Sequence, residues 1–315
     1  MGYVISVVLI VASLVAMYLS LLALKGKDYA TVQRGGGGLA RRAMTRGDAI
    51  FAYGTIGLIL VLTLAPHLGL LLLSFSTIWS FSPLPDGYTI AHYVQVFSDS
   101  GQYIVNTVLY AGLAALIDVV IGTAIAYLVL RAGVPGAKWL DYAATAALAV
   151  PGVVLGIGYL RTYFGVTLPS GQSLAAFWGM IVLALAIRRL PLALRACTAA
   201  LQQVSASLEE AAESLGATKA RMVRRIVLPL MTGGLAAGFV TSFATAAVEL
   251  SATMMLVQSS EDAPLAYGLY VFMQSPAGRG AGAALGIIAV VIVGICTYIS
   301  NRIVDGDMAA KAGAH

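Results

Sequence analysis

The stretch Arg195–Pro229 reads RACTAALQQVSASLEEAAESLGATKARMVRRIVLP and interrupts a chain that is otherwise mostly apolar. It is polar and basic, and apolar runs long enough to cross a bilayer lie on both of its sides. Because a charged helical insert between two membrane spans works in water, we expect it to contact a soluble partner.

The composition of the chain is that of an integral membrane protein. Of its 315 residues, 59% are hydrophobic and 10% are charged, whereas soluble domains carry about 25% charged residues. The net charge of +5 could indicate nucleic-acid binding, but the basic residues lie in loops between apolar runs, without interleaved aromatic residues. That pattern is the positive-inside signature, so we expect membrane lipid and no nucleic acid among the partners. Cys197 and Cys296 are too few and too far apart to indicate a disulfide framework or a zinc site.

Seven apolar runs can each cross the ~30 Å hydrocarbon core of a bilayer, which takes about 20 residues. They lie near 3–24, 49–77, 103–130, 139–164, 173–190, 230–256 and 282–303. This pattern predicts an all-α polytopic membrane protein. The first run has no basic residues before it and no clear small-residue cleavage site after it, so it is expected to be a helix and not a signal peptide.

A polar, glycine-rich stretch separates the first run from the others. We therefore expect a peripheral transmembrane helix and a cytoplasmic linker at 1–48, a compact six-helix domain at 49–305, and a cytoplasmic tail at 306–315. Within the compact domain, the insert is expected to form two short helices at about 205–226.

The positions of Lys and Arg predict the orientation of the chain. Nearly all of them lie in segments that are expected on the same side of the membrane. These segments are the linker, the loop with Arg131 and Lys138, the insert counted from Arg188 and Arg189 onward, and the tail. The opposite segments, near 78–102, 165–172 and 257–281, contain only Arg279. Basic loops stay in the cytoplasm, so the N-terminus is expected outside, and the insert and the C-terminus inside. The outer loop 79–102 is either an interfacial aromatic anchor or a lip that meets an external partner.

The insert itself predicts two short helices with a sharp turn between them. Ser207 and Glu210 have the spacing of a capping box, with Ser207 as the N-cap and the Glu210 side chain reaching back to its amide. Gly216 stands where a helix end needs a left-handed residue, and Thr218 can cap the next helix. The resulting knob could enter a groove on a partner, through Glu209, Glu210, Ala211, Ala212, Glu213, Leu215, Gly216 and Ala217. The alternative is an ordinary membrane-surface hairpin, in which Glu210 only caps and Gly216 only turns.

Three charged residues, Asp118, Arg161 and Glu249, fall within predicted spans. A charge at the centre of a bilayer costs about 2.5–3.5 kcal/mol on insertion scales, so such residues usually face a bundle interior or a cavity. All three are candidates for lining a pore, where the two acids would suit a cation and Arg161 an anion. The alternatives are an Arg161–Glu249 ion pair, or side chains that reach the headgroups. Glu249 lies about 20 residues past Pro229, which is roughly 30 Å along a helix. It is therefore expected towards the outer end of its helix.

No catalytic constellation is apparent in the sequence. It contains no phosphate-binding loop of the form G-x-x-x-x-G-K-S/T. It also lacks a nucleophile elbow and any His or Cys pair, and His67, His92 and His315 are isolated. We expect a non-catalytic chain with no cofactor or metal of its own, so that any ATP is hydrolysed by another subunit.

The spacing within the insert resembles a known signature. Glu210-Ala211-Ala212, three residues, Gly216, nine residues and Ile226-Val227-Leu228-Pro229 are similar to the EAA motif of ATP-binding-cassette (ABC) importer permeases. These are the binding-protein-dependent, type I permeases with the MetI-like fold, and the resemblance covers about 49–305. It implies a six-helix permease core in which the insert is a coupling helix that docks into a cleft of an ATPase subunit. It also implies two such ATPases carrying ATP and Mg, a second permease subunit, an external substrate-binding protein, and a bacterial inner membrane.

Shorter segments resemble the ferric-iron branch of these permeases, whose relatives include thiamine, polyamine and aminoethylphosphonate permeases. They are Arg188–Arg195 leading into Leu201-Gln202-Gln203, Val150–Tyr159 and Val248–Thr253. The resemblance implies import of a small solute by alternating access, with ferric iron as the leading candidate. The first span with Tyr29–Val32 resembles the junction of a fused permease pair, which implies a homologous but distinct partner permease. A secondary transporter is the alternative of a different class, although no inverted hydropathy repeat is visible.

Overall fold

The computed structural model of the protein describes residues 2–24, 45–79 and 82–312. These residues form helices joined by turns, with isolated β-bridges at Ser76–Tyr88 and Thr167–Ser173 and no strand among them. The all-α prediction is therefore confirmed. Most of the predicted linker lies outside the described residues.

Three helices of the described chain are long and apolar enough to cross a membrane. They are α2 (Arg46–Phe75), α4 (Gly101–Leu130) and α14 (Arg279–Ala312). α1 (Gly2–Leu24) corresponds to the first predicted run. Two bent helix pairs would raise the number of spans in the described residues to up to 5.

The fourth predicted run is a broken helix. α5 (Ala137–Ala146) and the 3-10 turn η2 (Ala147–Ala149) are bent by 104° against α6 (Gly152–Tyr163). The break falls at Val150 and Pro151, because proline lacks the N–H group that would continue the helix and disfavours a helical residue before it.

The sixth predicted run is also broken. α9 (Lys219–Met222), the π-helical turn η4 (Val223–Val227) and α10 (Leu228–Leu230) lead into α11 (Thr232–Ala247) through a bend of 73°. α11 ends at Ala247, well short of the predicted end near 256, and a separate short helix, α12 (Thr253–Leu256), follows it. Glu249 consequently lies in the turn between these two helices and not within a span helix.

α7 (Trp178–Gln203) runs past the predicted boundary at residue 190, although Pro191 lies inside it. Arg188 and Arg189 therefore belong to the middle of a helix, and assigning them to the cytoplasmic insert was wrong. The helix continues because its partner packs closely against it: a Cβ atom on Gly122 of α4 would lie 3.1 Å from the backbone nitrogen of Leu194. Tertiary packing here outweighs the local effect of the proline.

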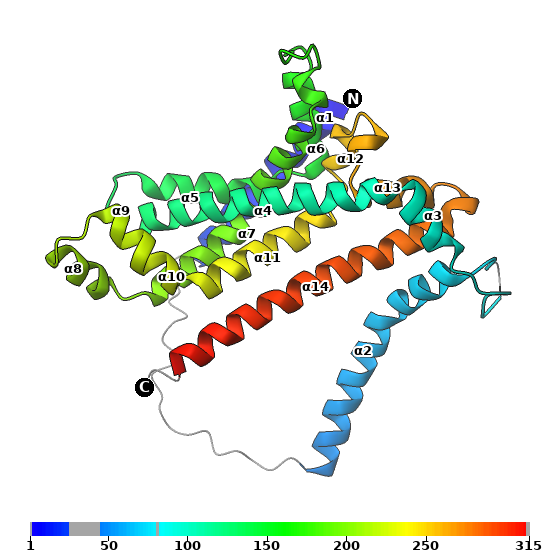
Figure 1. The fold of residues 1–315 in the computed structure, drawn as a ribbon, viewed down its shortest axis with the longest axis horizontal. Helices are drawn as coiled ribbons and strands as arrows, with labels where there is room; N and C mark the ends of the chain where they lie inside the picture. Colours follow the sequence, from blue (N-terminus) through cyan, green and yellow to red (C-terminus); the bar gives the residue numbers. More distant parts are fainter. Residues whose placement is uncertain (1, 25–44, 80–81, 313–315) are drawn as a thin grey trace.

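The core of the bundle consists of α4, α7 and α11, with α14 packed against α11 (Figure 1). Small residues such as Ala114, Ala184 and Ala246 are buried where these helices meet, and small residues allow helix backbones to approach closely in lipid. α2 leaves the bundle at an angle (Figure 1). Many of its large apolar side chains are exposed.

The predicted insert and two of the predicted outer segments lie at opposite ends of the bundle (Figure 1). One end carries α8 (Ala206–Ser214), α9 and η4. The other end carries α3 (Ala91–Asp99), α13 (Leu265–Met273) and the 3-10 turns η5 (Ser260–Asp262) and η6 (Pro276–Gly278), while η3 (Leu174–Ala176) precedes α7. The domain boundaries at 1–48, 49–305 and 306–315 stay predictions.

Candidate coupling helix and buried charge cluster

The N-terminus of α8 lies two residues earlier than predicted. Its N-cap is Ser205, which makes no side-chain capping bond and whose Oγ lies 2.7 Å from Oγ of Ser207. With this start, the third helical position is Leu208, an apolar residue that cannot reach back to the cap. The predicted capping box of Ser207 and Glu210 is therefore wrong, and Glu210 is exposed.

The C-terminus of α8 confirms the predicted turn. Gly216 has φ +81°, in the left-handed region. Its N–H donates to the Glu213 carbonyl at 2.9 Å, and the Ala217 N–H donates to the Ala212 carbonyl at 3.0 Å, which is the Schellman arrangement. Thr218 Oγ1 then accepts from the Arg221 N–H at 3.4 Å and caps α9 as expected.

Glu209 is the acid that fixes α8 to the bundle. Arg131, directly after α4, donates from Nε to Glu209 Oε1 at 2.8 Å. The same guanidinium donates from Nη2 to the carbonyls of Val204 at 2.6 Å and Leu201 at 3.2 Å, at the end of α7. The Tyr127 hydroxyl lies 3.5 Å from the second oxygen of Glu209. One side chain thus joins α4, α7 and α8.

The sequence reading missed this role of Arg131, because a basic residue at the end of a span was used only to orient the chain. The predicted knob residues divide into two sets. Glu209 and Ala212 are buried against the bundle, whereas Ala211, Glu213 and the apolar Leu215, 89% exposed, face away from it. α8 lies at the extreme end of the molecule (Figure 1), so this outer face is open to a partner.

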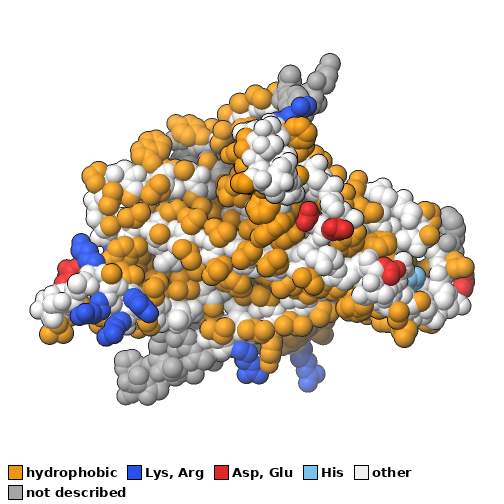
Figure 2. Space-filling view, turned by 45° about the horizontal axis from the view of Figure 1, so that its top comes forward, with side chains coloured by type: hydrophobic (Ala, Val, Ile, Leu, Met, Phe, Trp, Pro, Cys, Tyr) orange, Lys and Arg blue, Asp and Glu red, His pale blue; other side chains and the backbone are white. Residues whose placement is uncertain are grey.

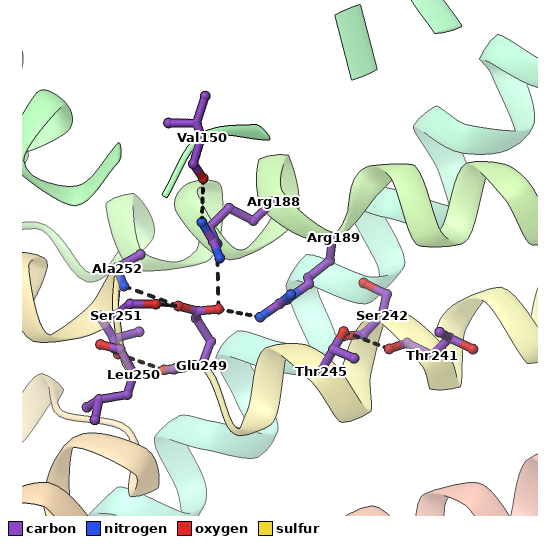
Figure 3. A network of polar contacts seen from close by, with 11 residues as sticks. Val150, Arg188, Arg189, Thr241, Ser242, Thr245, Glu249, Leu250, Ser251 and Ala252 are labelled. Atoms are coloured by element: carbon purple, nitrogen blue, oxygen red, sulfur yellow. Dashed lines mark hydrogen bonds and ion pairs between the residues drawn. The ribbon is translucent and has the colours of Figure 1, made fainter. Parts of the chain in front are cut away.

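A second polar cluster lies inside the bundle. Arg188 and Arg189 point from α7 towards Glu249, which is 5% exposed (Figure 3). Arg189 Nη2 donates to Glu249 Oε2, and Arg188 Nε lies 3.5 Å from the same oxygen. The other oxygen of Glu249 accepts from the Ser251 hydroxyl and from the Ala252 N–H at 3.2 Å.

This cluster also holds the break between α5 and α6. Arg188 Nη1 donates to the Val150 carbonyl at 2.9 Å, beside Pro151 (Figure 3). A freed carbonyl at membrane depth needs such a donor, because lipid offers none. The break between α5 and α6 and the turn between α11 and α12 are therefore satisfied by one set of charged side chains.

The structure places the three predicted intramembrane charges in different settings. The ion pairs of Glu249 are with Arg188 and Arg189, so the Arg161–Glu249 alternative is wrong, and Arg161 is an exposed residue in the last turn of α6. Glu249 directly follows the end of α11, as its predicted position near a helix end requires, and lies beside the middle of α7.

Asp118 lies within the packed bundle, 1% exposed, and its Oδ2 accepts from the Ser242 hydroxyl of α11. Its Oδ1 has no hydrogen-bond partner among the described residues. Pore lining by these three residues stays a prediction.

Comparison with known proteins decides the family. Residues 118–310 match the model of the binding-protein-dependent transport system inner membrane component. The chain belongs to this family. It is a permease component of an ABC importer, which confirms the resemblance of its insert and removes the secondary-transporter alternative.

The permease is 33% identical over 211 residues to the molybdenum transport system permease protein ModB of Escherichia coli, covering 64% of this chain and 91% of that protein. It is 28% identical over 165 residues to the ferric transport system permease protein FbpB of Actinobacillus pleuropneumoniae, covering 52% of this chain and 23% of that protein. The chain thus spans about a quarter of the length of this ferric relative.

A solved structure shares the fold of the permease. It is the bacterial alginate ABC transporter in complex with an alginate pentasaccharide-bound periplasmic protein, with a TM-score of 0.59 at 19% identity over 81% of this chain and 94% of that chain. This similarity confirms the MetI-like all-α fold, and the match to the inner membrane component family shows the membrane location.

Removal of Arg131 should release α8 from the bundle. Arg131→Ala leaves Glu209 and two carbonyls without their donor, and charged hydrogen bonds of this kind contribute about 1.5–3 kcal/mol each. Hydrogen exchange of the amides in Ala206–Leu215 should speed up more than about tenfold. The matched control is Arg195→Ala, whose exposed pair with Asp141 spans 2.9 Å and contributes about 0–1 kcal/mol. Equal exchange of α8 in both variants would contradict the anchoring role of Arg131.

Loss of the Glu249 charge should destabilise the bundle. Glu249→Gln leaves two half-buried arginines without their buried counter-charge, and removing one partner of a buried pair costs about 3–5 kcal/mol. Thermal unfolding of the purified protein measures this effect, and Glu261→Gln, at an exposed site, should cost less than about 0.5 kcal/mol. Wild-type stability of Glu249→Gln together with altered solute selectivity would instead support pore lining by Glu249.

Proposed function

We propose that this permease couples the closure of two ABC ATPase subunits to the import of a small solute, and that α8 is the helix that docks on the ATPase. The observation that carries this proposal is the shape of α8: an open outer face ending in Leu215, and an inner face fixed through Glu209 to Arg131. A helix without contacts on its inner face would move alone when the ATPase displaced it. A helix that is hydrogen-bonded to the bundle passes the displacement on to the bundle.

The contacts of the chain support a route for this movement. A push on α8 acts through Arg131 on the adjoining ends of α4 and α7. α7 carries the movement to Arg188 and Arg189, which hold Glu249 and the break at Val150. Rearrangement at these breaks would open the solute path to one side of the membrane and then to the other, which is alternating access.

The expected partners follow from this role. They are two ATPases that hold ATP and Mg, a second permease, which we expect to be a homologous but distinct chain, and an external substrate-binding protein. The solved alginate transporter is bound to a periplasmic protein, which supports the last of these partners. The permease is then non-catalytic, with its N-terminus outside and α8 and the C-terminus in the cytoplasm.

Two solute classes are supported by different observations. The segments Arg188–Arg195, Val150–Tyr159 and Val248–Thr253, together with the FbpB relative, favour ferric iron, and polyamine, aminoethylphosphonate and thiamine remain alternatives from the same resemblance. An oxyanion is the second candidate, because the ModB relative is covered over 91% of its length and Arg188 and Arg189 are half-buried cations within the bundle.

Substitution at Gly216 tests the coupling role. Gly216→Val forces a β-branched residue into the left-handed region, at a cost of about 1–2 kcal/mol, with no side chain nearby for the new group to contact. The turn after α8 should be lost, and with it the copurification of the ATPase and solute-stimulated ATP hydrolysis. Gly171→Val is the matched control, because Gly171 has φ +83° and an equally open site in the predicted outer loop. Unchanged ATPase binding in Gly216→Val would contradict the proposal.

The solute is identified through the external binding protein. We expect the purified cognate binding protein to stabilise on addition of ferric iron, measured as an increase in its melting temperature, and not on addition of molybdate or sulfate. Tight ligand binding should raise stability by about 4 kcal/mol at a thousandfold excess over Kd. Stabilisation by an oxyanion alone would overturn ferric iron in favour of the second candidate.

A further inference from the structure

An apolar groove of about 580 Å³ lies beside the end of α4 that leads to Arg131. Its walls are formed by α4, by Leu201 of α7 and by the segment that runs from η4 into α11, and the lining includes Val119, Val120, Thr123, Ala124, Tyr127 and Val227. The two polar groups in this set are bonded elsewhere: the Thr123 hydroxyl donates to Cys197 Sγ at 3.4 Å, and the Tyr127 hydroxyl lies 3.5 Å from Glu209. The groove therefore offers a hydrocarbon surface.

A basic hollow of about 380 Å³ lies on the same segment, lined by Ala220, Arg221, Arg224 and Arg225. The three arginines are exposed, and no carboxylate of the described chain lies within 4.0 Å of them. Basic side chains gather at this end of the molecule (Figure 2). The hollow consequently carries three positive charges that the described residues do not neutralise.

The groove and the hollow share the π-helical turn η4. Val223 and Val227 line the groove, whereas Arg224 and Arg225, between them in sequence, line the hollow. π-helical turns are rare and occur frequently at functional sites. An apolar channel and a positive hollow on one turn of helix match a ligand with a hydrocarbon chain and a negative head.

The depth of the groove matches one leaflet of a bilayer. Its lining on α4 runs from Val119 to Leu128, near the helix end at Leu130. From Val119 to that end the helix rises roughly 17 Å, and half of the hydrocarbon core is about 15 Å. An acyl chain whose phosphate lies at the arginines would therefore fill the groove along its length.

We propose that this region is a binding site for an anionic phospholipid of the cytoplasmic leaflet, with its headgroup at Arg221, Arg224 and Arg225 and one acyl chain in the groove. Clusters of basic residues at the cytoplasmic membrane surface attract anionic lipids. The proposal rests on the cytoplasmic placement of α8 in the proposed function. Since Tyr127 both lines the groove and contacts Glu209, a bound lipid would also stiffen the connection between α4 and α8.

The test uses the complete transporter, purified with its partner subunits and exchanged into nanodiscs of phosphatidylcholine with increasing palmitoyl-oleoyl phosphatidylglycerol. Native mass spectrometry counts the phosphatidylglycerol molecules retained per permease. Arg224→Gln combined with Arg225→Gln should weaken retention about thirtyfold, because each basic residue near the surface contributes about a factor of five. Ala124→Trp, which fills the groove from an exposed position, should also remove the lipid. Val120→Trp serves the same purpose if Ala124→Trp does not fold.

The matched control removes the same number of charges elsewhere. Lys138→Gln combined with Arg302→Gln should retain the lipid like the wild type, since neither residue lines the groove or the hollow. Full retention in the Arg224/Arg225 variant would overturn the proposal. Loss of the ATPase from this variant with the lipid retained would also overturn it, and would assign the arginines to the ATPase interface. Loss of the second permease from Ala124→Trp with the lipid retained would assign the groove to that subunit.

The outcome is independent of the coupling test. If Gly216→Val keeps the ATPase while the Arg224/Arg225 variant loses phosphatidylglycerol, the lipid site stands and the coupling role of α8 fails. If Gly216→Val releases the ATPase and all variants retain the lipid, the coupling role stands and the lipid site fails.

Discussion

A helix can break at membrane depth only where other groups satisfy the backbone that it frees, and in this permease the Glu249 cluster meets that requirement at two breaks. Arg188 donates to the Val150 carbonyl between α5 and α6, while Glu249 accepts from the Ala252 N–H in the turn after α11. Because Arg188 and Arg189 meet the same carboxylate, the two breaks are held by one network beside the middle of α7. Movement at one break has to carry the other with it, or leave a buried charge without a partner.

α7 joins this network to the end of the bundle that carries α8. Between Arg189 and Leu201 the helix rises about 18 Å. The carbonyl of Leu201 then accepts a hydrogen bond from the guanidinium of Arg131. Its planar fork donates to Glu209 and to the carbonyls of Leu201 and Val204 at the same time. A lysine ammonium lacks this fixed fork of donors. The geometry of arginine thus converts three separate helix ends into one rigid joint.

Local features of the sequence were predictable, and long-range pairs were not. Composition and apolar runs indicated an all-α membrane chain, and the Gly216 turn followed because the left-handed region is a property of a single residue. The capping-box prediction was wrong because α8 begins two residues earlier than expected. The start of α8 depends on where α7 ends. Arg131 and Glu209 are 78 residues apart, and Arg189 and Glu249 are 60 apart. No local rule pairs such residues. Arg131 was therefore used only to orient the chain, Glu209 was assigned to the surface that contacts a partner, and Glu249 was assigned to a pore or paired with Arg161.

The π-helical turn η4 connects the end of the bundle that carries α8 with the apolar groove beside α4. The turn directs Val223 and Val227 towards the groove beside α4, where Tyr127 forms part of the wall. The Tyr127 hydroxyl also contacts one carboxylate oxygen of Glu209, while Arg131 donates to the other. An occupant of the groove would restrict the movement of the Tyr127 ring. The ring would in turn restrict the Glu209 carboxylate, to which Arg131 donates. In the proposed coupling role, the stiffness of the connection between α8 and α4 would depend partly on this chain and partly on the occupant of the groove.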